Sequence, residues 1–390
     1  MKNTHIFLIL GMALIGCTPM DRMESISYRV FEYVESDFTE LNKLNPFLGD
    51  FTDLLFFMDK SLIFSITALE YETVDPFGNT VTASGLVYHP INKKSRGVID
   101  FLPTAHLEKT GGGTDEIYAI EGVLILLGYT IIMPDLLGSG KSKDIPIPFL
   151  MVENTGRVTY DMRRAAARYL WDQFEYVIPS ETIIMGYSLG GSAALATQKY
   201  YETNYAHTVK VKEVYASSGT YDLPAAFEAF AQTGVSEYAA IPNVIVAFNH
   251  YYDLRLDLSQ IFKDVLLDPT IRNNFLYGEY NSSAQGRILG HDLHLYMHDD
   301  FFKPLEEQNE ELQKLYPYLV KNSTTEGWRP QAPIYMTHAT PDTYVPVECA
   351  EAAVKKLRRA GANISFMTYP GDHLTVGYLF FLRSIFHFLL

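Results

Sequence analysis

The chain is poor in cysteine: its 390 residues include only Cys17 and Cys349. At most one intrachain disulfide could form, and none could form if Cys17 carries a modification. Stability must therefore come from the hydrophobic core. Hydrophobic residues make up 47% of the chain, which is enough for one large domain with an insertion and no covalent cross-links.

Basic residues are also scarce, with 31 Lys and Arg against 46 Asp and Glu and a formal net charge of -15. Because phosphate binding needs a basic patch and none is visible, the sequence argues against nucleic acid as a partner. Long apolar runs are missing too. The N-terminal run over residues 6–15 has about 10 residues, whereas a membrane span needs roughly 20, so a transmembrane anchor is disfavoured.

The N-terminus has the features of an export signal: Lys2, the apolar run, and a small residue, Gly16, before Cys17. Residues 14–17, Leu-Ile-Gly-Cys, resemble the lipobox of bacterial lipoproteins. The resemblance implies that residues 1–16 are a removed signal peptide, which leaves a formal charge of -16. It also implies that a lipid on Cys17 anchors the protein to a membrane of the bacterial cell envelope. Thr18, rather than Asp, follows the cysteine, which favours the outer membrane; a plain secretory signal is the alternative.

Strand and helix patterns alternate after a first section, residues 17–60, that we expect to form a tether and N-terminal helices. Ser65–Tyr71 and Thr80–Tyr88 flank a turn with Pro, Gly and Asn, which predicts a hairpin. Residues 97–101 and 129–135 read as strands, with a helical stretch over 116–127 between them. Strand, helix, strand is the signature of a parallel sheet.

The alternation continues through a long helix over 157–176 and a strand over 209–216, and then stops. Residues 221–330 show helical periods without a convincing buried strand, and strands return at 333–338 and 364–369. These patterns predict an α/β fold with a mostly parallel, twisted sheet flanked by helices. Its core would comprise residues 61–220 and 331–390, and residues 221–330 would form a helical cap insertion.

The most informative motif is Gly-x-Ser-x-Gly at residues 186–190, which follows an apolar strand-like run and precedes a helix-like segment. Gly186 and Gly190 lack the Cβ atoms that would clash in a sharp strand-to-helix turn, so Ser188 can project from the sheet edge. This context favours a nucleophile elbow over an ordinary turn.

A serine nucleophile needs a base and a group that orients the base. In a doubly wound sheet these partners lie on loops at the carboxyl ends of later strands. Asp342 follows the predicted strand that ends at His338, and His373 follows the last predicted strand. The order along the chain is therefore Ser188, Asp342, His373, although each partner could instead be an ordinary turn or helix-start residue.

The elbow at 186–191, Asp342 with the Val-Pro pair that follows it, and His373 together resemble the α/β-hydrolase superfamily. Residues 134–140 and the predicted cap add a narrower resemblance to the secretory lipase and carboxylesterase branch. The resemblance implies that Ser188 attacks the carbonyl of a small-molecule or lipid ester, that His373 is general base and then acid, and that Asp342 orients His373. No cofactor and no metal are implied.

An oxyanion hole in this superfamily combines two backbone N–H groups. Leu189, directly after the nucleophile, would supply the first. The second would come from the loop after the strand at 97–101, which departs from the common His-Gly form. Pro103 has no N–H, so Thr104 or Ala105 is the expected donor.

Two other motifs could carry function. Residues 138–142 end in Gly-Lys-Ser, but Asp135 stands where a phosphate-binding loop needs glycine, so we read them as a turn in which Asp135 braces the site. His291, His294 and His298 would share one face if their segment were helical, which leaves zinc binding open against a solvated cap helix. His106, His250 and His338 are expected to be structural.

Two other functions stay open. A prolyl- or aminopeptidase-type serine peptidase would use the same triad, and recognition of a free amine would favour acidic cap residues that point into the pocket. The candidates are Glu306, Glu307, Glu310 and Glu311. A non-catalytic binding lipoprotein is disfavoured, because all three triad residue types occur in the expected order.

Overall fold

The computed structural model describes residues 26–44, 58–104, 107–115 and 124–389. The predicted signal peptide, the lipidation residue Cys17, the oxyanion candidate Ala105, His106 and most of the predicted helix over 116–127 lie outside these ranges.

A nine-stranded, mostly parallel sheet forms the core, with the order β1-β2-β3-β5-β4-β6-β7-β8-β9. The first three strands pair antiparallel with their neighbours, as does β3 with β5, and all pairs from β5 to β9 are parallel. This arrangement confirms the predicted α/β architecture. The strands are β1 (Tyr28–Asp37), β2 (Ile63–Val74), β3 (Thr80–Pro90), β4 (Val98–Leu102), β5 (Thr130–Pro134), β6 (Glu181–Tyr187), β7 (Lys210–Ser217), β8 (Ile334–Thr340) and β9 (Ile364–Pro370).

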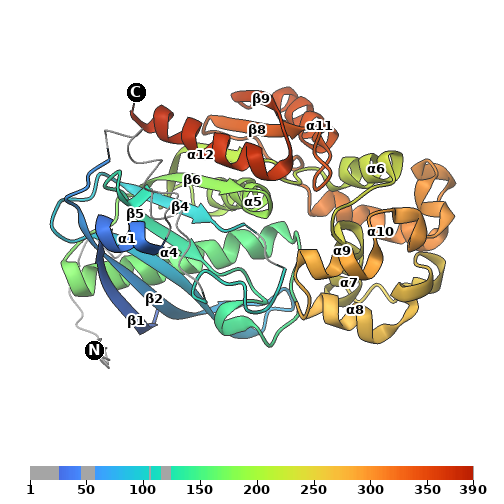
Figure 1. Ribbon diagram of the computed structural model, residues 1–390, viewed down its shortest axis with the longest axis horizontal. Coiled ribbons are helices and arrows are strands. Elements are labelled where there is room, and N and C mark those ends of the chain that lie inside the picture. The colour runs from blue at the N-terminus through green and yellow to red at the C-terminus, as the bar shows by residue number, and fades with distance from the viewer. Residues whose placement is uncertain (1–25, 45–57, 105–106, 116–123, 390) are drawn as a thin grey trace.

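Helices cover both faces of the sheet (Figure 1). On one face, apolar side chains of α4 (Val152–Phe174), α5 (Leu189–Asn204) and α11 (Val347–Arg359) pack against the strands. On the other face, α12 (His373–Leu389) and α1 (Phe38–Leu44) do so. Burial on both faces explains why the central strands read as continuous apolar runs in the sequence. None of the helices within the described ranges is long and apolar enough to cross a membrane.

The segment expected to form a cap, residues 221–330, lies between β7 and β8 and beside one end of the sheet (Figure 1). It contains α6 (Leu223–Thr233), α7 (Ala240–Tyr251), α8 (Pro269–Leu276), α9 (Ser282–Leu289), α10 (Glu310–Lys321) and several short 3₁₀ helices. Its buried side chains form a hydrophobic cluster centred on α7, which also includes Phe149 and Met151 from the core. The cap therefore has its own core and is joined to the α/β core by shared apolar contacts.

The prediction for residues 17–60 was wrong in one respect, because the described part begins with a strand and not with helices. Strand β1 pairs with β2 over Tyr28–Asp37, and only the short α1 follows. Most β1 side chains are half-buried or exposed. Backbone pairing with the edge strand β2, rather than burial of side chains, therefore determines the structure of β1. Such pairing does not require alternating hydrophobic residues, so the sequence shows no strand pattern there. The predicted hairpin is confirmed by β2 and β3, which pair from Phe64 with Pro90 to Val74 with Thr80.

We expect a buried histidine on β3 to make the fold sensitive to acid. His89 is 5% exposed, its Nδ1 lies 2.8 Å from Oγ1 of Thr130 on β5, and its ring contacts Phe174 and Tyr176. Burial lowers the pKa of His89 from 6.5 to about 4. The folded protein therefore holds this ring neutral under conditions in which the unfolded chain binds a proton.

Because the unfolded state binds the extra proton between these two pKa values, the free energy of unfolding should fall as pH drops. We expect His89 to account for a loss of about 2–3 kcal/mol between pH 7.5 and pH 4.5. Urea unfolding at both pH values, in the natural protein and in His89→Leu, measures this contribution. In the variant Thr130 keeps its bond to Ser95. An identical pH slope in the two proteins would contradict the assignment.

Candidate active site

Ser188 lies at the sharp turn between β6 and α5 and has φ 58° and ψ -123°, an unusual conformation for a residue other than glycine. Two glycines permit the turn. A Cβ on Gly186 would lie 2.0 Å from the carbonyl oxygen of Gly190, and a Cβ on Gly190 would lie 2.2 Å from that of Leu102. The backbone thus has the geometry expected for an elbow that presents the serine side chain above the sheet edge.

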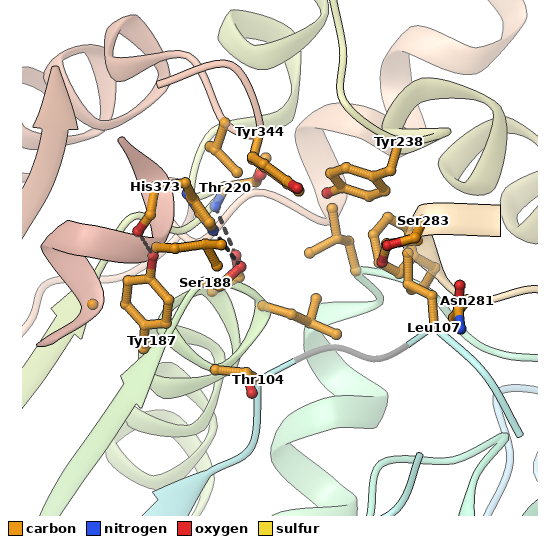
Figure 2. Close-up of a pocket in the computed structure, with 18 of the residues that line it drawn as sticks. Thr104, Leu107, Tyr187, Ser188, Thr220, Tyr238, Asn281, Ser283, Tyr344 and His373 are labelled. Carbon is orange, nitrogen blue, oxygen red and sulfur yellow. Dashed lines mark hydrogen bonds between the residues drawn. The ribbon is translucent and has the colours of Figure 1, made fainter. Parts of the chain in front are cut away.

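The structure brings the three predicted side chains into one hydrogen-bonded chain, of which Figure 2 shows Ser188 and His373. Nε2 of His373 lies 2.9 Å from Oγ of Ser188, and Nδ1 of His373 lies 2.8 Å from Oδ2 of Asp342. His373 is the first residue of α12, and Asp342 lies in the loop between β8 and α11. The Asp342 carboxylate can accept from Nδ1–H, which leaves Nε2 free to take a proton from the serine.

The second oxygen of Asp342 is held by backbone groups. Its Oδ1 accepts hydrogen bonds of 2.9 Å from the N–H groups of both Tyr344 and Val345. His338 lies behind the carboxylate, fully buried, with Nε2 2.8 Å from the Val345 carbonyl oxygen and 3.4 Å from Oδ2 of Asp342. Burial lowers the pKa of His338. The structure therefore places this histidine, expected to be structural, against the predicted orienting acid.

Tyr187, which sequence reasoning did not single out, fastens the start of α12 to the elbow. Its hydroxyl donates to the backbone carbonyl of His373, and its ring lies 5.2 Å from the imidazole. Gly377 makes room for it, because a Cβ at that position would lie 3.0 Å from the tyrosine ring. The sequence offered one signal for this role of Tyr187, which is its position directly before Ser188 in the Gly-x-Ser-x-Gly motif.

Replacing Tyr187 with phenylalanine should keep the ring packing but remove one hydrogen bond to His373. A net hydrogen bond is worth about 1 kcal/mol, so we expect kcat/KM for an ester to fall by about fivefold, mainly through kcat. Steady-state kinetics checks this. Tyr335→Phe, on β8 and outside the cavity, is the matched control and should leave kcat/KM unchanged.

The candidate oxyanion donors lie on two neighbouring segments. Leu189 is the first residue of α5, where helix N–H groups have no partner within the helix. The backbone after β4 passes close to this helix start, since the carbonyls of Leu102 and Pro103 approach Gly190. Thr104 lines the cavity near Ser188, whereas Ala105 lies outside the described residues (Figure 2).

Ser188 and His373 line a cavity of about 510 Å³ between the sheet edge and the cap. Figure 2 shows Tyr238, Asn281 and Ser283 of the cap facing Ser188 across this space. The lining mixes apolar and hydroxyl-bearing side chains. It includes Leu107, Phe149, Leu150, Thr220, Tyr344, Val345, Leu374, Tyr378 and Phe381.

Charged groups are scarce in this cavity, where Glu108 is the only carboxylate among the described lining residues. The four cap glutamates that a peptidase would favour, Glu306, Glu307, Glu310 and Glu311, do not line it. Glu311 instead accepts from Lys314 and from the backbone N–H of Asp257.

The three cap histidines do not share a helix face, because only a 3₁₀ turn, Leu293–Leu295, forms in their segment. His291 lies 3.2 Å from Glu237 and His294 lies 2.9 Å from Asp292. No cluster of three or more potential metal ligands occurs in the described parts of the chain. His250 packs between Phe77 and Tyr251 and does not line the cavity.

The turn over residues 138–142 is built around the buried side chain of Asp135. Asp135 accepts from Ser84 and Thr114, and a Cβ on Gly140 would lie 2.2 Å from its carboxylate. Burial raises the pKa of Asp135. The residue therefore ties the loop at 112–115 to the sheet, and the cavity lining does not include it.

No protein-family model and no curated protein sequence matches the chain. Solved structures do match. The rice cell wall degrading esterase LipA of Xanthomonas oryzae has a TM-score of 0.73 and 20% identity, over 89% of this chain and 91% of that one. A protein of Legionella pneumophila with a provisional hydrolase assignment has a TM-score of 0.74 and 19% identity, and the match covers 94% of this chain and 97% of that one. Candida antarctica lipase A has a TM-score of 0.57 and 15% identity, and the match covers 89% of this chain and 77% of that one. Together with the sheet order and the cap, these matches show that the chain has an α/β-hydrolase fold.

Proposed function

We propose that this protein is a serine hydrolase that cleaves carboxylic esters. The observation that carries the proposal is the hydrogen-bonded chain from Ser188 through His373 to Asp342, exposed to a cavity of about 510 Å³. A serine hydroxyl is a poor nucleophile on its own, and this arrangement supplies both the base and the group that orients it.

In the proposed reaction, His373 Nε2 takes the Ser188 proton as Oγ attacks the ester carbonyl carbon. Asp342 accepts from Nδ1–H, fixes the tautomer of the ring and stabilises the imidazolium that forms. His373 then protonates the departing alkoxide, the ester C–O bond breaks, and the alcohol leaves an acyl-enzyme on Ser188. A water activated by His373 hydrolyses the acyl-enzyme and restores the serine.

The tetrahedral intermediates carry a negative oxygen that needs donors. The N–H of Leu189 is the proposed first donor. The proposed second donor comes from the segment after β4, with Thr104 the described candidate and Ala105 the other. Removal of one such donor typically lowers kcat by a factor of about 10²–10³.

Several features support an ester rather than a peptide as substrate. Among the described residues, the cavity lining has one carboxylate, Glu108, and none of the cap glutamates that would bind a free amine. Two structural neighbours are named as an esterase and a lipase, which also favours small-molecule or lipid esters.

Hydrolysis of p-nitrophenyl esters, set against Pro- and Ala-p-nitroanilides, tests the choice of substrate class. Ester turnover that disappears in Ser188→Ala is the expected result. Turnover of the anilides without an ester preference would replace the proposal with a peptidase. Silence on both substrate classes would favour a non-catalytic binding lipoprotein.

We also propose that a lipid on Cys17 anchors the enzyme in the bacterial cell envelope, at the outer membrane. The support is the lipobox-like Leu-Ile-Gly-Cys at residues 14–17 and Thr18 after it. Expression in a bacterial host with labelled palmitate should give a labelled protein in the outer-membrane fraction, and Cys17→Ser should abolish the label. A secreted, unlabelled protein would contradict the anchor.

A further inference from the structure

A second, smaller cavity of about 50 Å³ lies beside the start of α5. It shares five lining residues with the large cavity: Phe149, Leu150, Leu189, Ser192 and Thr220. The two spaces are therefore neighbours at the helix turn that follows Ser188. From there the smaller cavity runs along α5 past Ala193 to Ala196, which lies about 12 Å along the helix from the nucleophile.

Its chemistry is apolar. Most of its lining is aliphatic or aromatic and comes from the segment 136–150, from α4 and from α5, and no described residue that lines it carries a charge. Four of the six polar side chains among its described lining residues, those of Asn154, Ser192, Asn322 and Thr324, have protein partners. Asn154 donates to the Val74 carbonyl, Ser192 accepts from the Thr220 N–H, and Thr324 donates to the Tyr221 carbonyl. A polar ligand would find few free groups there, whereas a hydrocarbon chain would bury its surface.

The direction of the triad decides which half of an ester this cavity can receive. His373 must protonate the departing alkoxide, so the alcohol has to lie beside His373. The large cavity is lined by His373 and by Leu374, Gly377 and Tyr378 of the same helix, and none of these residues lines the small one. The small cavity, which adjoins Leu189 and Ser192 and does not include His373, is therefore placed to receive the acyl chain on the opposite side of the carbonyl carbon.

We propose that the small cavity between α4 and α5 is the acyl-chain subsite and that it selects short acyl groups. This inference rests on the proposed ester hydrolysis at Ser188 and adds a substrate class to it. A space of about 50 Å³ holds roughly four water-sized groups, which corresponds to acyl chains of about four to six carbons. Near Ala196 the two helices approach closely, because a Cβ on Gly156 would lie 2.2 Å from the Tyr200 side chain and 3.2 Å from the Ala196 carbonyl oxygen, and we expect this contact to limit the chain length.

Three variants test the subsite with p-nitrophenyl esters from acetate to decanoate. Ala196→Leu fills the cavity and should lower the ratio of kcat/KM for hexanoate to that for acetate by about tenfold or more. Leu137→Ala enlarges the cavity and should move the highest kcat/KM to an ester with a longer acyl chain. This variant tests the subsite even if Ala196→Leu fails to fold. Leu195→Ala, equally buried on α5 but lining neither cavity, is the control and should keep the natural profile.

A second series holds the acyl group at butanoate and varies the alcohol from ethanol to octanol. The ranking of these esters by kcat/KM should be the same in Leu137→Ala and Ala196→Leu as in the natural protein. An altered alcohol order, or an acyl profile that neither variant changes, would overturn the subsite. These results differ from a failure of the proposed function, in which the natural protein would show no ester hydrolysis that depends on Ser188.

Discussion

Ser188→Ala should lower kcat for p-nitrophenyl butanoate by about 10⁴–10⁶-fold and leave the fold intact. The substitution deletes the one oxygen that attacks the substrate and accepts the acyl group. The backbone of the elbow should persist, because Gly186 and Gly190 still permit the turn and the Ser188 N–H still donates to the Ser217 carbonyl, a bond of 2.8 Å. Steady-state kinetics and the midpoint of urea unfolding measure the two effects separately.

Ser139→Ala is the matched control for this experiment. Ser139 lies in the turn after β5, donates to the Leu136 carbonyl and does not line either cavity. We expect its turnover to equal that of the natural protein. Residual activity in Ser188→Ala within tenfold of the natural protein would show that another group is the nucleophile.

Asp342→Asn is the second substitution with a large expected effect, a loss of about 10⁴-fold in kcat. The amide oxygen of the introduced side chain can still accept from the Tyr344 and Val345 N–H groups, so the loop should keep its shape. The amide N–H₂ would face His373 Nδ1 in place of an acceptor. The imidazole would then carry its proton on Nε2 and could not take the serine proton.

The neighbouring acid Asp372 provides the control. It is exposed and caps the start of α12 through the Thr375 N–H, a role that asparagine fills equally well. Asp372→Asn should therefore remain close to the natural protein in kcat and in the midpoint of urea unfolding. A similar loss of activity in both variants would mean that charge near His373, rather than the orientation of its ring by Asp342, limits the rate.

Much of the fold and of the candidate site could be predicted because local patterns specified it. The apolar strand before Ser188 and the glycines around it predict a turn that requires missing Cβ atoms, and these contacts appear at Gly186 and Gly190. Asp342 and His373 each follow a strand of one parallel sheet, so their loops converge at one edge. Chain order and strand ends were therefore sufficient to bring three distant residues together.

The remaining features depend on contacts that no local pattern encodes. Strand β1 is held by pairing with β2, and its exposed side chains leave no period to detect. Tyr187 reads as one more residue of an apolar strand until α12 packs over it and receives its hydrogen bond. The segment with His291, His294 and His298 shows helical spacing, but short turns and local acids hold it in another shape.

Covalent labelling of the natural protein with a p-nitrophenyl alkylphosphonate tests the central claim most directly, since this reagent reacts with an activated serine and forms a stable adduct. We predict release of one p-nitrophenolate for each protein molecule, loss of ester hydrolysis in parallel, and an adduct located on Ser188 by peptide mass spectrometry. The Ser188→Ala protein should remain unlabelled. Labelling at a different residue, or inactivation of ester hydrolysis without an adduct on Ser188, would contradict the account.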